Sequence, residues 1–325
     1  MLFVANNSLD PAYNLAAEEY LLKQKQMPAI MLWQNDRAII VGKNQNTMAE
    51  INYQYVKENG ITVCRRLTGG GAVFHDRGNL NYTVISDNTG KLGDYAYFSK
   101  DLTDFLKTLG LNAEISGRND VLLNGKKICG NAQTTYKNLV LHHGCILFSA
   151  DLSSLTNALK VDPEKIADKG IKSVKSRVVN IQSLLYKKID IDEFRKLFAD
   201  FIIKRHALTV YEFTDREKDI IKNLREQKYN TYNWNYGNSP QYTYKNRKRY
   251  TFGTVELYLD VKDGIIDKCK IKGDFFGAKD ITDFEKLFIG KKYDLQDIKT
   301  VLSAADTNKY IANAEKDDII KLFFE

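Results

Sequence analysis

Residues 63–82 read Val63-Cys-Arg-Arg-Leu-Thr-Gly-Gly-Gly-Ala-Val-Phe-His-Asp-Arg-Gly-Asn-Leu-Asn-Tyr82, and this stretch decides how the rest of the chain is interpreted. An apolar strand leads into two adjacent arginines, Arg65 and Arg66, and three consecutive glycines follow at 69–71. Glycine loses more backbone freedom on folding than any other residue, so three in a row are costly for an ordinary turn. They are expected where bare N–H groups lie against anionic oxygens, with arginine as a bidentate partner for phosphate or carboxylate. The residues alone also allow a glycine-rich hairpin with solvated arginines.

Two common nucleotide-binding motifs do not account for these glycines. The run lacks the Gly-Lys-Ser/Thr ending of a P-loop, and its spacing is not that of the dinucleotide fingerprint G-x-G-x-x-G. A nucleotide bound here would therefore lie in a different fold. The alternating residues that follow predict a hairpin whose outgoing strand reaches Phe74.

A second hairpin is predicted around Asn124-Gly125, the strongest two-residue turn signal in the chain. It places Lys126 and Lys127 directly after the turn, and the two side chains should face opposite sides because strand residues alternate. A rigid strand can aim one ammonium group at developing negative charge. Asp120 on the partner strand could orient that lysine, hold Mg²⁺ together with phosphate oxygens, or be merely structural.

Several stretches together resemble the lipoate–protein ligase A family, within the biotin/lipoate ligase superfamily. The likeness spans nearly the whole chain, so the combination is more specific than any single motif. The matching stretches lie at 65–76 (Arg-Arg-Leu-Thr-Gly-Gly-Gly-Ala-Val-Phe-His-Asp), 116–121, 125–132, 142–144, 169–178, 234–237 and 252–257.

The resemblance implies the site residues. Lys127 would be catalytic, and Asp120 is the candidate Mg²⁺ ligand. Lipoate binding would fall on Lys127, Gly70, Gly71 and His143. Nucleotide or lipoyl-AMP binding would fall on Arg66, Gly71, Ala72, Val73, Phe74, Asp120, Lys127, Lys172 and Ser173. Three residues keep a structural alternative: Phe74 as core packing, His75 as a satisfied and partly buried histidine, and Lys172 as a solvated loop lysine.

The resemblance also implies a two-step reaction that uses ATP, Mg²⁺ and lipoate. Lipoate attacks the α-phosphate of ATP to give lipoyl-AMP and pyrophosphate, and a lysine amine of an acceptor protein then takes the lipoyl group. The implied acceptors are apo lipoyl domains of 2-oxoacid dehydrogenase E2 subunits, glycine cleavage H protein, or both, expected to be acidic. The reaction needs no enzyme nucleophile.

Other functions remain open on the sequence. A lipoyl or octanoyl transferase with a thioester intermediate would need a cysteine downstream of His143, but residues 150–169 contain none, and Cys129 is interpreted as the thiol near Lys127. A different acyl acid, including biotin, is also compatible. The net charge of +7 allows a nucleic-acid-binding module, but the lysines are spread along the chain, so no nucleic-acid binding is expected.

The predicted fold class is α+β, with mixed sheets and flanking helices. A large biotin/lipoate-ligase-like catalytic domain is expected at 1–244 and a small α+β accessory domain at 245–325. Residues 152–211 are predicted to be helical, and 229–249 are interpreted as a connector. The N-terminus has no basic segment before an apolar core, and no stretch approaches the roughly 20 apolar residues that span a bilayer, so a cytoplasmic protein without membrane contact is expected.

Overall fold

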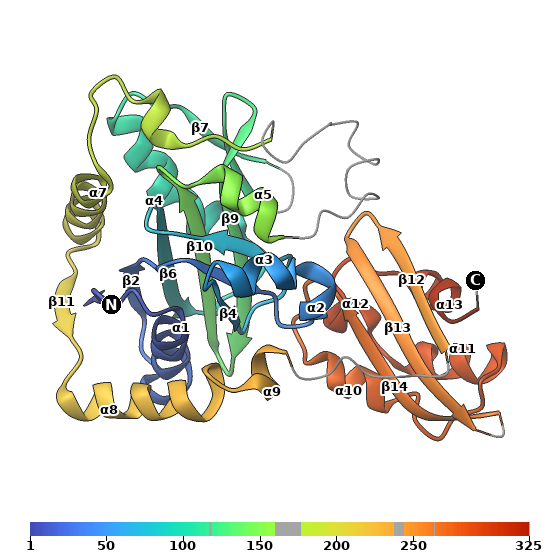
Figure 1. Ribbon diagram of the computed structural model, residues 1–325. Helices are drawn as coiled ribbons and strands as arrows, with labels where there is room; N and C mark the ends of the chain where they lie inside the picture. The colour runs from blue at the N-terminus through green and yellow to red at the C-terminus, as the bar shows by residue number, and fades with distance from the viewer. Residues whose placement is uncertain (117–118, 160–176, 237–243, 263, 325) are drawn as a thin grey trace. The chain divides into compact units, whose positions relative to one another are not determined.

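The computed structural model describes residues 1–116, 119–159, 177–236, 244–262 and 264–324 (Figure 1). The chain divides into two compact units. We call the first the large unit; it comprises Met1–Ile40, Ile51–Arg65 and Val73–Asn235. The second, the small unit, comprises Val41–Glu50, Arg66–Ala72 and Tyr236–Glu325.

The large unit is built on an eight-stranded sheet with the order β11-β1-β2-β6-β10-β9-β8-β7. β11, β1 and β2 are parallel neighbours, and the remaining pairs are antiparallel. The strands are β1 (Leu2–Ala5), β2 (Ala29–Trp33), β6 (Asn79–Asp87), β7 (Ala113–Ser116), β8 (Asp120–Leu123), β9 (Lys126–Tyr136), β10 (Leu139–Leu147) and β11 (Thr209–Glu212). Parallel and antiparallel pairs in one sheet give the mixed α+β architecture that the sequence predicts.

The two faces of this sheet differ in chemistry. Large apolar residues alternate along the strands on one face, where α4 (Tyr95–Thr108) and α7 (Ile191–His206) bury them in a common core (Figure 1). The other face carries polar residues, among them Asn81, Thr83 and His143, together with apolar ones such as Met31, Trp33 and Ile85. Other helical segments of the large unit are α1 (Pro11–Glu19), η1 (Tyr20–Lys25), α3 (Tyr53–Glu58), α5 (Leu152–Ala158), η2 (Ile181–Leu184), α8 (Asp215–Leu224), η3 (Arg225–Tyr229) and α9 (Tyr232–Asn235).

A second sheet corrects the predicted glycine hairpin. Its order is β4 (Thr62–Arg65), β3 (Ala38–Val41), β5 (Val73–His75), so β3 lies between the strands that flank the glycines. The glycine run is therefore a crossover loop, and the hairpin prediction is wrong. β4 and β5 both pair with β3, which comes earlier in the chain, and the turn residues between β4 and β5 do not indicate this pairing.

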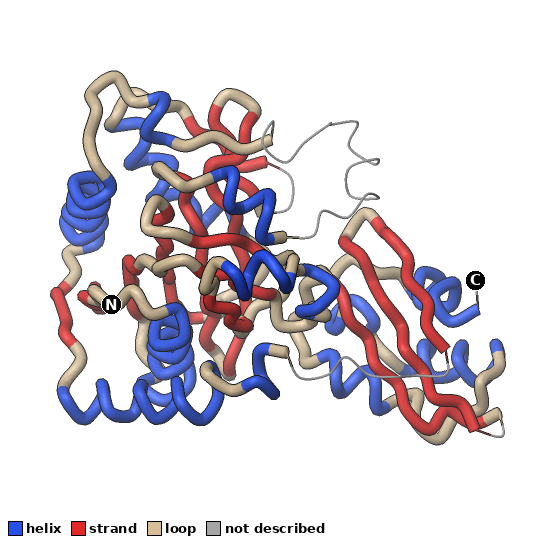
Figure 2. Tube along the Cα trace, viewed as in Figure 1, coloured by secondary structure: helices blue, strands red, loops and turns tan. Residues whose placement is uncertain are grey.

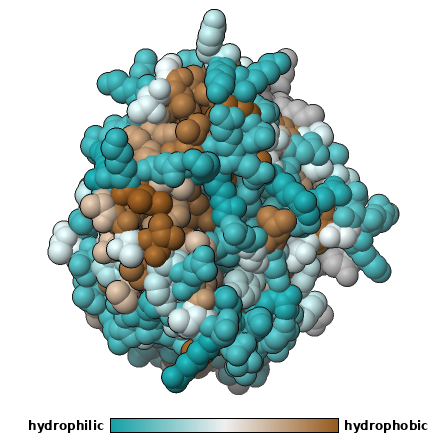
Figure 3. Space-filling model, turned by 90° about the vertical axis from the view of Figure 1, so that its left-hand side faces the viewer, coloured by the Kyte–Doolittle hydropathy of each residue, from teal (hydrophilic) through white to brown (hydrophobic). Residues whose placement is uncertain are grey.

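Two strands were missed by the sequence interpretation. β11 overlaps the end of the stretch predicted to be helical; it is a four-residue edge strand that depends on its pairing with β1, and Val210 on it is 55% exposed. Figure 3 looks onto the side that carries β11, where apolar side chains interrupt the polar surface. β12 (Tyr244–Tyr250) replaces the end of the predicted connector. Its Tyr244, Asn246 and Tyr250 donate hydrogen bonds to carbonyls near the C-terminus, so polar residues take the place of the expected apolar ones.

The small unit contains a three-stranded antiparallel sheet in the order β12-β13-β14, visible in Figure 2 as three red strands beside blue helices. Its core gathers apolar residues of the strands and of the C-terminal helices. The elements are α2 (Thr47–Glu50), β13 (Gly253–Lys262), β14 (Ile265–Gly273), α10 (Ile281–Lys286), α11 (Leu295–Ala304), α12 (Thr307–Tyr310) and α13 (Lys316–Phe324). Within the described ranges, none of the helices has the length and apolar character to cross a membrane.

Candidate active site

Lys127 and Asp120 form an ion pair on the hairpin of β8 and β9. Asn124 and Gly125 both have positive φ, 53° and 73°, which confirms the tight turn predicted between the strands. Lys127 Nζ lies 2.8 Å from Asp120 Oδ1, and the two side chains are 33% and 35% exposed. The pair is thus preformed and still open to a substrate.

A β-bulge decides which residues share a face with this pair. Val121 pairs with Cys129, but Leu122 pairs with Lys127, so β9 contains one extra residue at that point. The extra residue reverses the alternation of side chains along β9. As a result Gly130, which pairs with Asp120, lies on the same side as Lys127.

Gly130 provides the space that the lysine occupies. A Cβ atom at this position would lie 2.6 Å from Lys127 Nζ and 2.8 Å from its Cε. No real Cβ atom makes contacts this short, so any larger residue would displace the ammonium group. Gly130 is part of the 125–132 stretch that resembles the ligase family, but the sequence alone shows no physical need for a glycine at this position.

The backbone of Lys127 is held on its other edge as well. Its N–H donates to Arg177 O at 2.8 Å, and its carbonyl accepts from Val179 N–H at 3.1 Å. The neighbouring Lys126 is exposed. The predicted nucleotide-binding residues Lys172 and Ser173 lie outside the described residues.

A row of paired residues extends from Asp120 across five strands. Asp120 pairs with Gly130, Gly130 with Cys145, Cys145 with Asn81, and Asn81 with Trp33. Directly paired residues in antiparallel strands project from the same face. On the face that carries the lysine, this row is therefore small or polar as far as Asn81 and ends at the large ring of Trp33.

His143 lies on the same face, in the adjacent row. It is 8% exposed, and its Nδ1 lies 3.0 Å from Oε1 of Glu18, a buried carboxylate of α1. The hydroxyl of Thr83 donates to Glu18 Oε1 at 2.5 Å and accepts from Trp33 Nε1 at 2.8 Å. The sequence interpretation missed Glu18; its signal was an acidic residue at a buried position of a helix.

His142 faces the opposite side and belongs to the core. Its ring stacks on Phe98 and lies 3.1 Å from both Tyr82 Oη and Gln133 Nε2. Burial holds the pKa of His142 well below its usual value, so the ring is neutral. Tyr82 Oη also donates across Gly144 to Asn131 Oδ1 at 2.6 Å. His142 and Gly144 belong to the 142–144 stretch that resembles the ligase family, and their packing against core residues accounts for them without any part in the reaction.

The cysteine on the lysine's face is Cys145. Cys129 is completely buried on the core side, and burial raises the pKa of its thiol well above the usual value. Cys145 is only partly buried and lies 3.4 Å from Asn79 Nδ2. The interpretation of Cys129 as the thiol near Lys127 therefore overlooked Cys145, whose place two residues after His143 was the available signal.

Arg66 shapes the glycine loop from within. In the small unit, its Nη2 donates to Gly69 O at 2.7 Å and Gly71 O at 2.8 Å, and its Nε donates to Thr68 Oγ1 at 2.9 Å. Gly70 has a φ of +90°, which favours glycine, whereas a Cβ at Gly71 would meet open space. The guanidinium fork is thus directed at loop carbonyls, although phosphate or carboxylate was the expected partner.

The residues around the loop divide between packing and accessibility. Ala72 and Val73 are partly exposed, but Phe74 is buried on β5, which supports its core alternative. Arg65 donates from Nε to Trp234 O at 2.9 Å, and burial lowers the pKa of its guanidinium to about 10. His75 is 3% exposed, more buried than expected, and Asn35 Nδ2 lies 3.0 Å from one of its two ring nitrogens, Nδ1.

Asp120 fits a metal ion only as a minor ligand. It is a single carboxylate, already paired with Lys127, and the described residues contain no cluster of three or more His, Cys, Asp or Glu able to hold a metal. Mg²⁺ commonly uses one or two carboxylates and takes its other ligands from substrate phosphates and water. The donor set therefore suits a Mg²⁺ ion that arrives with a nucleotide.

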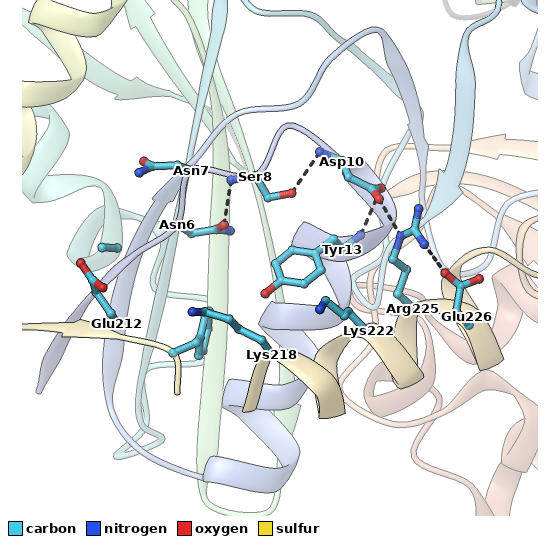
Figure 4. A pocket seen from close by; sticks show the side chains of 12 residues that line it. Asn6, Asn7, Ser8, Asp10, Tyr13, Glu212, Lys218, Lys222, Arg225 and Glu226 are labelled. Carbon is cyan, nitrogen blue, oxygen red and sulfur yellow. Dashed lines mark hydrogen bonds and ion pairs between the residues drawn. The ribbon is translucent and has the colours of Figure 1, made fainter. Parts of the chain in front are cut away.

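An open cavity of about 730 Å³ lies elsewhere in the large unit, at the ends of β1 and β11 (Figure 4). The ring of Tyr13 lies between the loop that follows β1 and the lysines of α8. Asp10 is paired with Arg225 at 2.6 Å, so charged groups of the lining neutralise one another. The cavity contains none of the predicted site residues.

The fold is that of lipoate ligases. Plasmodium falciparum LipL1 in complex with lipoate superposes with a TM-score of 0.81, at 26% identity, over 98% of this chain and 97% of that chain. A bi-partite ligase of Thermoplasma acidophilum, described with its E2 lipoyl domain, gives 0.65 at 30% identity over 75% and 98%. A lipoate-protein ligase A bound with ATP gives 0.62 at 26% identity over 73% and 98%.

The sequence comparisons define the family. Residues 10–203 match the lipoyl protein ligase A/B catalytic domain, and residues 239–323 match the bacterial lipoate protein ligase C-terminus. Lipoate-protein ligase LplJ of Bacillus subtilis is 40% identical over 100% of both chains, and lipoate–protein ligase 1 of Staphylococcus aureus is 41% identical over 99% of both. The chain belongs to the lipoate–protein ligase family and is an enzyme of the ligase class.

Proposed function

We propose that the enzyme activates lipoate with ATP to give lipoyl-AMP and pyrophosphate, and then transfers the lipoyl group to a lysine of an acceptor protein. The observation that carries this proposal is the ammonium group of Lys127, placed over Gly130 and paired with Asp120 at 2.8 Å. The relatives with bound ATP and bound lipoate support the two small substrates.

Lys127 acts in both steps as a fixed positive charge. In the first step it attracts the lipoate carboxylate and the α-phosphate oxygens, and it stabilises the charge that develops as the carboxylate oxygen bonds to phosphorus. In the second step it stabilises the acyl oxygen while the acceptor amine displaces AMP. Asp120 holds the ammonium group in place between turnovers. If Mg²⁺ accompanies the nucleotide, Asp120 supplies it one oxygen, and the ion offsets phosphate charge.

The glycine loop binds the nucleotide largely through its backbone. Arg66 keeps the loop in shape by binding the carbonyls of Gly69 and Gly71. Gly70, Gly71, Ala72, Val73 and Phe74 then contact the adenylate, largely through the main chain, and Gly70 and Gly71 also contact lipoate. His143, oriented by the buried Glu18 carboxylate, lines the lipoate site.

The acceptors are apo lipoyl domains of 2-oxoacid dehydrogenase E2 subunits, glycine cleavage H protein, or both. The Thermoplasma acidophilum ligase described with its E2 lipoyl domain supports the first class. The formal net charge of +7 suits acidic acceptors. We further propose a catalytic domain at 1–244 and an accessory domain at 245–325, supported by the two separate family matches. The cytoplasmic location remains a prediction.

A thioester-forming transferase is the second candidate, because Cys145 offers a partly accessible thiol on the face of Lys127. ATP–pyrophosphate exchange with lipoate, octanoate and biotin in parallel separates the two. The proposal expects exchange that depends on lipoate and persists in Cys145→Ser. Absence of exchange, together with an acyl group trapped on Cys145 and found by mass spectrometry, would establish the transferase instead.

A further inference from the structure

Asn81 is a buried amide with an unused donor. It lies on β6, is 1% exposed, and its Nδ2 has no hydrogen-bond partner among the residues that the structure describes. Buried side-chain donors are normally paired, because leaving one unpaired costs free energy. On the face of the sheet that carries Lys127, an acceptor atom of a bound ligand can satisfy this donor.

The sheet places this amide on the row that begins at Asp120, the ion-pair partner of Lys127. Asn81 pairs with Cys145, and Cys145 pairs with Gly130, over which the Lys127 ammonium lies. Adjacent strands are about 4.8 Å apart, so two strand spacings put Asn81 roughly 10 Å from Gly130. An acid whose carboxylate binds Lys127 and whose chain extends along this row brings its far end to Asn81. Trp33 follows on the next strand and can pack against an apolar ring.

The other polar groups near this position are engaged with one another. Trp33 Nε1 donates to Thr83, Thr83 donates to Glu18, and Glu18 accepts from His143. Asn79, on the same face, donates from Nδ2 to Cys145 Sγ and accepts from Asp76 N–H. The Nδ2 group of Asn81 is therefore suited to recognise the ligand.

We propose that Asn81 makes the enzyme prefer a dithiolane acid over a saturated acid of the same length. This inference rests on the proposed lipoate activation. The two sulfurs are weak acceptors at the end of lipoate opposite its carboxylate, whereas octanoate ends in a methyl group. When lipoate binds, Nδ2 of Asn81 donates to a ring sulfur. When octanoate binds, the amide stays buried without a partner, which weakens binding.

The experiment varies the ligand and the residue together. Binding of lipoate and of its carbocyclic analogue, in which methylenes replace both sulfurs, is measured by calorimetry without ATP, and ATP–pyrophosphate exchange gives kcat/KM for each acid. The full-length wild-type enzyme should favour lipoate about threefold to tenfold, the range of one modest hydrogen bond. Asn81→Leu, similar in volume, should reduce this ratio to near one. Asn79→Leu is the matched control and should keep the ratio.

Each result decides the matter. Equal binding of lipoate and the analogue by the wild-type enzyme overturns the inference, even if Asn81→Leu does not fold. An unchanged ratio in a folded Asn81→Leu overturns it as well, since the residue would then contact only the part that both acids share. Lipoate binding without any pyrophosphate exchange would instead count against the proposed function, while the binding ratio still tests Asn81.

Discussion

Replacing Gly130 with alanine should disable Lys127 without unfolding the protein. The new Cβ would lie 2.6 Å from Lys127 Nζ, and ordinary contact begins at 3.4 Å, so the ammonium group must move by at least 0.8 Å. The displaced atoms are the far end of a flexible side chain, so the backbone of β9 can stay in place. The ion pair with Asp120, now 2.8 Å, would lengthen or break.

The expected effects on stability and on rate differ widely. An ion pair that is about one-third exposed contributes about 0–1 kcal/mol to the free energy of unfolding. Alanine restricts the unfolded chain relative to glycine, which stabilises by about 0.4–1 kcal/mol. These terms nearly cancel. A displacement of about 1 Å of a positioning group, in contrast, can lower the rate about 100-fold.

The assay measures both half-reactions and the folding equilibrium. ATP–pyrophosphate exchange follows adenylation, transfer from supplied lipoyl-AMP follows the second step, and urea unfolding gives the stability of Gly130→Ala. The double variant with Lys127→Ala is the control, because a glycine that acts through the lysine should cost no further activity once the lysine is gone. Activity within threefold of wild type, or fully multiplicative losses in the double variant, would refute this account of Gly130.

Three further outcomes follow from the structure. Lys127→Ala should abolish adenylation and transfer from lipoyl-AMP, whereas the exposed Lys126→Ala should lose less than about threefold; equal losses in the two assays would contradict the assignment. Cys129→Ser should keep lipoylation within roughly tenfold, since removal of a true nucleophile lowers the rate about 10³-fold or more, and Cys145→Ser should behave likewise in the same assay. His142 is neutral when folded, so below pH about 6.5 only the unfolded chain takes up its proton, and stability should fall by up to about 1.4 kcal/mol per pH unit from this group. His142→Gln should flatten that decline in urea titrations between pH 6.5 and 5, and an unchanged slope would argue against a neutral ring.

The sequence predicted best where the signal was local. Asn124-Gly125 specified a turn with two positive φ angles, and the structure has both. The strands at Ala29–Trp33 and Ala38–Val41 are short apolar runs between turn residues, a pattern that is visible in the sequence without a distant partner. Their partners could not be predicted, and the two strands belong to different sheets.

The parts of the site that could not be predicted come from pairing across the sheet. Lys127 and Asp120 were expected to lie together because one hairpin contains both. Glu18 approaches His143 from a helix 125 residues away in sequence. Asn81 joins the site through β10, which lies between its strand and that of the lysine. No pattern of adjacent residues in the sequence predicts contacts between segments so far apart in the chain.

The bulge in β9 shows how a single residue sets the chemistry of this face. In a regular hairpin that turns at Asn124-Gly125, Lys127 and Asp120 would share a face with Cys129, and the next strand would present Ile146 and Gly144 there. That is the apolar face covered by α4 and α7. The extra residue in β9 exchanges Cys129 for Gly130, so the same lysine and aspartate face small and polar residues. Turn chemistry brought the ion pair together, but the bulge placed it where a substrate can reach it.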